Sequence, residues 1–100
     1  MDTPQEPSVL AGLPAFDWDN DRAVRYEVAQ EAIGQAVAAY TVLINQAAEQ
    51  GDAAREAQLS EAQKACIDAR NGLSSADATA LDAVVSRYRT LIADLRAQAA

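Results

Sequence analysis

Apolar residues recur along most of the chain at alternating intervals of three and four positions. The longest run combines large side chains with alanines, at Tyr26, Ala29, Ile33, Ala36, Tyr40, Leu43 and Ala47. Two later runs, within residues 59–73 and 81–95, keep the same spacing. Because this spacing puts apolar side chains on one face of an α-helix, it predicts three amphipathic helices packed side by side.

Turn-forming residues separate the three runs. Gly51-Asp52 follows the first run and Asn71-Gly72 follows the second, while no proline occurs after Asn20. Glycine is common just past helix ends, and proline-free, alanine-rich sequence favours helix. We therefore predict helices near 19–50, 53–71 and 75–98. Since short connections make neighbouring helices antiparallel, the expected fold class is all-α, an antiparallel up-down-up three-helix bundle with a long first helix.

Residues 1–18 differ in composition from the predicted three-helix domain at 19–100. They contain all three prolines of the chain, and residues 1–21 carry five acidic side chains and no basic one, out of a net charge of −7. Because proline disfavours helix, we expect an irregular, acidic N-terminal arm. The arm also contains Leu10, Leu13, Phe16 and Trp18. We expect these apolar side chains to dock on a protein surface.

The first predicted helix has more apolar surface than two neighbours can cover. Its apolar positions span roughly 200° of the helix circumference, whereas an ordinary surface helix buries a stripe of about 100°. Either the arm or a second copy of the chain can cover the remainder. We favour a homodimer through this helix over a self-covered monomer. The candidate partner or dimer interface comprises Val28, Ala32, Ala39, Val42, Leu10, Leu13, Phe16 and Trp18.

The side chains needed for most catalytic and metal sites are missing. The chain has no histidine, one cysteine (Cys66) and one lysine (Lys64). This composition excludes disulfides within the chain, zinc sites built from Cys and His, and catalytic dyads or triads that use histidine. No carboxylate falls on a predicted helix seam. We therefore expect no enzyme, no catalytic residues and no cofactor.

Two acidic patterns match metal-binding sequences only in part. Residues 17–21 place acidic side chains at alternating positions, as a calcium loop does, but Arg22 and Val28 occupy the positions that need glycine and glutamate. Glu27 and Glu31 stand four residues apart, as in di-iron bundles, but no histidine accompanies them. We interpret these residues as helix caps and solvated surface, and we expect no metal.

Tyrosine, cysteine and arginine side chains in the predicted helices also have structural explanations. Tyr40, Tyr88 and Cys66 fall on seams, as Tyr26 does, so we interpret them as core residues. The arginines near the end of the third helix, Arg87, Arg89 and Arg96, could contact an acidic partner or a phosphate. We interpret them as a solvated face near a helix C-terminus, where cations are favourable.

Charge and hydropathy narrow the class of partner. The net charge of −7 argues against direct binding to nucleic acid, and no apolar run approaches the roughly 20 residues of a membrane span. Seven arginines against one lysine, with 24 alanines, suggest a bacterial protein, and the absence of signal-peptide features suggests the cytoplasm. We expect a protein–protein interaction module, such as an adaptor, antitoxin-like protein or regulatory partner. It would bind itself, an unidentified protein, or both. The alternative is an acidic inhibitor or mimic that engages a basic nucleic-acid-binding protein through its arm.

Overall fold

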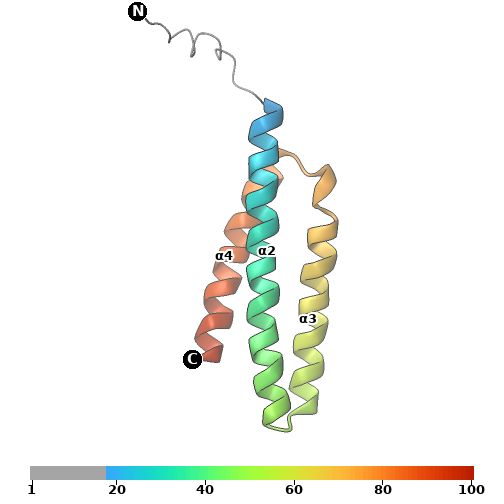
Figure 1. The fold of residues 1–100 in the computed structure, drawn as a ribbon, viewed down its shortest axis with the longest axis vertical. Coiled ribbons are helices and arrows are strands. Elements are labelled where there is room, and N and C mark those ends of the chain that lie inside the picture. Colours follow the sequence, from blue (N-terminus) through green and yellow to red (C-terminus); the bar gives the residue numbers. More distant parts are fainter. Residues whose placement is uncertain (1–17) are drawn as a thin grey trace, which may run out of the picture.

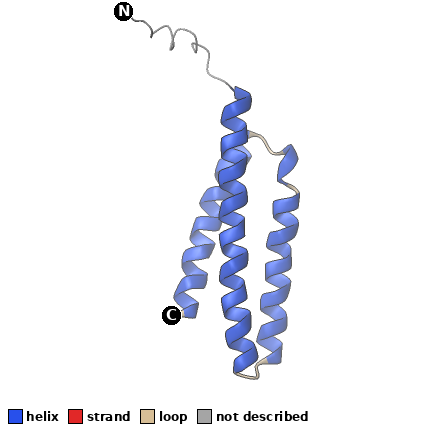
Figure 2. Cartoon of the chain, in the orientation of Figure 1, coloured by secondary structure: helices blue, strands red, loops and turns tan. Residues whose placement is uncertain are grey.

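Three helices that run alternately up, down and up form the fold. The computed structural model describes the backbone of residues 18–100 and the side chains from residue 20 onward. Its elements are α2 (Trp18–Glu49), α3 (Ala53–Asn71), the short 3-10 helix η1 (Leu73–Ser75) and α4 (Ala78–Ala99) (Figures 1 and 2). The predicted all-α three-helix fold with a long first helix is thereby confirmed.

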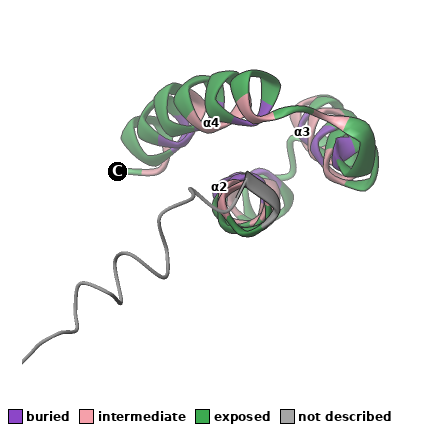
Figure 3. Ribbon diagram, turned by 90° about the horizontal axis from the view of Figure 1, so that it is seen from above, coloured by how far each residue is buried: buried purple, intermediate pink, exposed green. Residues whose placement is uncertain are grey.

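The long helix α2 is the centre of the structure. Both α3 and α4 pack along it, whereas the backbones of α3 and α4 make little contact with each other (Figure 3). The largest fully buried side chains are Ile33 and Leu43 of α2 and Leu81 of α4. Since α2 meets both partners, it supplies half of the core, namely Ala29, Ala32, Ile33, Ala36, Tyr40, Leu43 and Ala47.

The helix ends agree with prediction except at the start of α4. The bounds of α3 match, and α2 begins and ends one residue early. The third helix was predicted to begin at residue 75, but α4 begins at Ala78. Asp77 is its N-cap, because the Asp77 carboxylate accepts a 2.8 Å hydrogen bond from the backbone N–H of Ala80. Ser74 belongs instead to η1, which buries Leu73.

Substitution by alanine should have opposite effects on stability at Gly34, within α2, and at Gly51, in the turn that follows α2. Gly51 has φ 71°, a left-handed conformation that strains other residues, whereas Gly34 lies inside α2, where a Cβ would meet only Arg70 Nη1 at 3.9 Å. We expect Gly51→Ala to lower the free energy of unfolding by about 1 kcal/mol, and Gly34→Ala to raise it by about 0.5–1 kcal/mol. Urea denaturation measures both changes. Shifts of the same sign in the two variants would contradict this account.

Candidate protein interface

The predicted interface residues on α2 divide into exposed and covered positions. Val28 and Val42 are 40% and 49% exposed, and Val24, which the sequence analysis did not single out, is 51% exposed. Ala32 is buried, and Ala39 is partly buried against the core, so these two alanines contribute to packing within the chain. The described part of the chain therefore leaves three valines of one helix in contact with solvent.

The structure describes little of the predicted interface residues of the arm. Leu10, Leu13 and Phe16 lie outside the described residues, and only the backbone of Trp18, at the start of α2, is described.

The exposed valines line an open groove between α2 and α4. The groove consists of three adjoining hollows of about 550, 180 and 250 Å³. Val28, Val85 and Arg89 line both the first and the second hollow, and Gln35 lines both the second and the third. The groove thus follows the helix pair from the level of Val24 and Asp82 to that of Val42 and Ala99.

The α4 wall of this groove was missed by sequence reasoning. Val85 and Leu95 contribute apolar surface to it, and Arg89 and Arg96 contribute positive charge. The available signal was that Val85 and Ala99 lie beside the main seam of the third run, which widens its apolar stripe towards one side. The pattern of one helix does not show which neighbour that side will face.

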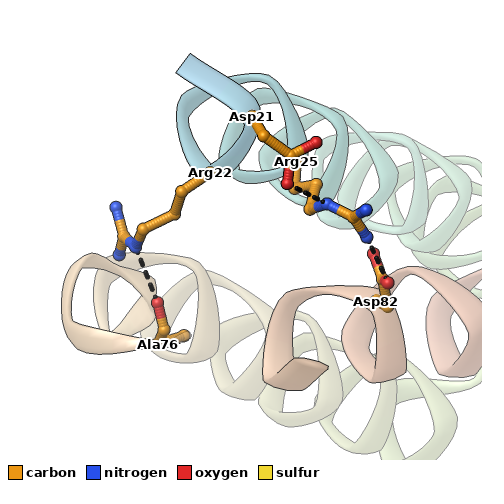
Figure 4. A network of polar contacts seen from close by, with 5 residues as sticks. All are labelled: Asp21, Arg22, Arg25, Ala76 and Asp82. Atoms are coloured by element: carbon orange, nitrogen blue, oxygen red, sulfur yellow. Dashed lines mark hydrogen bonds and ion pairs between the residues drawn. The ribbon is translucent and has the colours of Figure 1, made fainter. Parts of the chain in front are cut away.

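The arginines of the groove differ in their partners. Arg25, at one end, donates hydrogen bonds to Asp21 at 2.7 Å and to Asp82 (Figure 4). These two hydrogen bonds, the one to Asp82 foremost, raise the pKa of Arg25 above its ordinary value. Within residues 20–100, by contrast, Arg89 and Arg96 form no ion pair. The middle hollow is lined by both Arg89 and Glu31, without an ion pair between them, and Arg96 lines the third hollow.

Arg22 fixes the end of the helix pair where this groove begins. Its Nε donates to the carbonyl oxygen of Ala76 at 2.9 Å (Figure 4). Its Nη2 donates to the carbonyl oxygen of Ser74 at 2.7 Å. These bonds tie the first turns of α2 to the connection between α3 and α4. Arg22 also lies over the ring of Tyr26, with its Cζ 5.7 Å from the ring centroid.

Cys66, Tyr40 and Tyr88 lie in the core, as the sequence indicated. All three are less than a tenth exposed. Burial is the main cause that raises the pKa of the Cys66 thiol and of both tyrosine hydroxyls. A buried thiol with a raised pKa carries little thiolate at neutral pH, so Cys66 is poorly suited to act as a nucleophile.

The same pKa shifts predict how stability varies with alkaline pH. An unfolded chain loses its thiol proton near pH 8.5, before the folded chain does, so the folded state holds more protons above that pH. The stabilisation is complete below this value and is lost as the pH rises through the folded pKa. We expect the free energy of unfolding to fall above about pH 9. Denaturation of Cys66→Ala should give a flatter dependence between pH 8.5 and 10. Equal slopes would contradict the assignment.

No chemical centre accompanies the groove in the described part of the chain. Residues 20–100 contain no cluster of three His, Cys, Asp or Glu side chains that could hold a metal ion. None of the described helices has an apolar stretch sufficient for a membrane span. No family model, no curated protein and no solved structure matches the sequence.

Proposed function

We propose that this chain is a small, non-enzymatic protein–protein interaction module whose binding surface is the α2–α4 groove, and that it forms a homodimer through α2. The observation that carries the proposal is the exposure of Val24, Val28 and Val42 along a row of three adjoining hollows between α2 and α4. Isolated exposed valines are ordinary on protein surfaces, but apolar side chains gathered along one groove mark interaction sites.

The composition of α2 suits pairing with another helix. The face that borders the groove combines Val28 and Val42 with the small side chains of Ala38 and Ala39. Small residues let a second helix approach closely, and the valines then supply apolar contact area. A chain of this size also has a limited core of its own, so burial of this face would stabilise it further.

The core gives independent support to a non-enzymatic role. Among the described residues, the buried set contains no charged side chain, and the hydroxyls and thiol in it have pKa values raised by burial. General acid–base catalysis requires a group that exchanges protons near neutral pH in a cleft. A binding surface is the activity that the described side chains support best.

Sedimentation equilibrium over a wide concentration range tests the homodimer directly. We expect the average mass to rise with concentration from that of one chain, 10.6 kDa, towards twice that mass. A mass that stays at the value of a single chain up to millimolar concentration would contradict the homodimer. A heterotypic partner would then remain as the occupant that the groove requires.

A further inference from the structure

We propose that the chain's own N-terminal segment, residues 1–17, occupies the α2–α4 groove within the same molecule and competes there with the second copy. This inference rests on the proposed function, because it names the regulator of the same surface. It assigns the groove two alternative occupants, of which only one can be present at a time.

Charge complementarity is the first argument. The groove carries Arg89 and Arg96 without ion-pair partners among the described residues, and the acidic side chain that joins them in its lining is Glu31. Asp82 lies at one end and is already paired with Arg25. The lining of the groove thus has three arginines, Arg25, Arg89 and Arg96, against the two carboxylates Asp82 and Glu31, on a chain whose net charge is −7. An acidic occupant therefore fits it best.

The composition of residues 1–17 matches that requirement. The segment carries three acidic residues, Asp2, Glu6 and Asp17, and no basic residue. Its apolar residues include Leu10 and Leu13. Leucines provide the apolar contacts that exposed valines lack, and carboxylates provide partners for arginines at the groove edge. Attraction across so short a distance is only partly screened at physiological ionic strength.

The point of attachment and the length of the segment also fit. It joins α2 at Trp18, six residues or about 9 Å of helix before Val24, where the groove begins. From Val24 to Val42 the groove follows 18 residues of α2, about 27 Å. Seventeen extended residues span up to about 56 Å, enough to reverse direction and follow the groove. Leu10 and Leu13 then reach the level of the exposed valines, and Glu6 reaches that of Arg96.

Because residues 1–17 are covalently attached to the three-helix domain, weak contacts are sufficient to hold them in the groove. A short tether presents a segment to its own domain at an effective concentration of about 1 mM, so an occupancy of about two thirds needs only sub-millimolar affinity. A dimer requires both grooves to be open. Its apparent Kd therefore rises by the inverse square of the open fraction, which is about tenfold when one third of the grooves are open.

Full-length chains in a Cys66→Ala background provide a direct test. A spin label attached at Ser8→Cys should weaken the NMR methyl signals of Val28 and Val42, while those of Ile67 on α3 keep their intensity. Equal effects on all three residues, or none, would overturn the proposal. In a second sample the spin label and the isotope label are on different chains. Loss of the valine signals there would place the segment on a neighbouring molecule and overturn the intramolecular arrangement.

Self-association supplies the functional readout. Leu10→Asp with Leu13→Asp should release the segment and lower the dimer Kd by about tenfold, because the competitor is removed. Gln5→Asp with Ser8→Asp adds the same charge to the segment but keeps both leucines, and should leave the Kd the same or raise it, because the segment still competes. Equal Kd values in the two double variants would overturn the competition. If no variant dimerises, the proposed homodimer is wrong, while the spin-label experiment still decides where the segment lies.

Discussion

Replacement of Ile33 by alanine should remove a large part of the stability of this protein. Ile33 is 0% exposed and lies in the middle of α2, where both α3 and α4 pack. The change deletes three buried carbon atoms and leaves a cavity, at a cost of about 3–4 kcal/mol. A domain of 100 residues has a total stability on the order of 5–15 kcal/mol, so a substantial unfolded fraction should appear at moderate temperature.

Val24→Ala is the matched control for this prediction. It truncates a similar β-branched side chain on the same helix, but at a position that is 51% exposed. We expect it to change the free energy of unfolding by less than about 1 kcal/mol, because little buried surface is lost. Urea denaturation at low protein concentration gives both values without a contribution from self-association. Similar losses in both variants would contradict the placement of Ile33 at the centre of the core.

The large effect expected at Ile33 follows from the shape of the fold. The backbones of α3 and α4 each pack closely along α2 and make little contact with each other, so α2 takes part in most of the helix packing. The alanines of the α2 seam, such as Ala29 and Ala36, let its neighbours approach closely. Few large side chains lie among these alanines, and removal of one leaves a gap that an alanine is too small to fill.

Local sequence signals were sufficient to predict the helices and most of their ends. The interval of three and four residues in α2 is continuous from Tyr26 to Ala47, and all but Tyr26 of those seam positions are buried. The bounds of α3 were predictable because Gly51-Asp52 and Asn71-Gly72 flank it. Periodicity and turn residues act over one or two helical turns, so a single sequence contains them in full.

The start of α4 and the α4 side of the groove depend on information that the local pattern lacks. Both Ser74 and Asp77 are good N-cap residues, but Ser74 lies within the 3-10 helix Leu73–Ser75, in which Leu73 is buried, and Asp77 caps α4. Likewise, Val85 and Arg89 meet the valines of α2 only because α4 crosses α2 at a particular angle and level. Helix crossing geometry depends on all the contacting side chains together.

The width of the apolar face indicated surplus surface at Val28 and Val42, which are exposed, whereas Ala32 and Ala39, predicted with them, are largely covered within the chain. Val28, four residues before Ala32, and Val42, three residues after Ala39, remain exposed at the edge of the groove. A helical wheel gives the angular position of each residue but not the distance to its neighbour. The exposed part of the predicted interface is therefore narrower than the sequence suggested.

Replacement of Val28 and Val42 together by glutamate should abolish self-association through α2. In the proposed dimer these side chains leave water, and the desolvation of a carboxylate costs more free energy than attraction to a nearby arginine, Arg89 or Arg96, returns. Two such groups per chain should weaken the dimer at least about 100-fold, equivalent to about 2.7 kcal/mol. Sedimentation should then show a single chain at concentrations where the unaltered protein is dimeric. Because both positions are 40% or more exposed in the isolated chain, its fold should be retained.

Ala57→Glu with Ala65→Glu is the control that separates the position of the charge from its amount. Both alanines are exposed on α3, and no residue of α3 lines the groove, so this variant gains the same two charges away from the proposed interface. It should dimerise nearly as well as the unaltered chain, since surface charges away from a contact are largely screened beyond about 10 Å at 0.1 M salt. Equal association of the two double variants would mean that α2 is not the interface. A large fall in melting temperature confined to Val28→Glu with Val42→Glu would mean that these valines are covered within a single chain, and the segment before Trp18 would then be the occupant to examine.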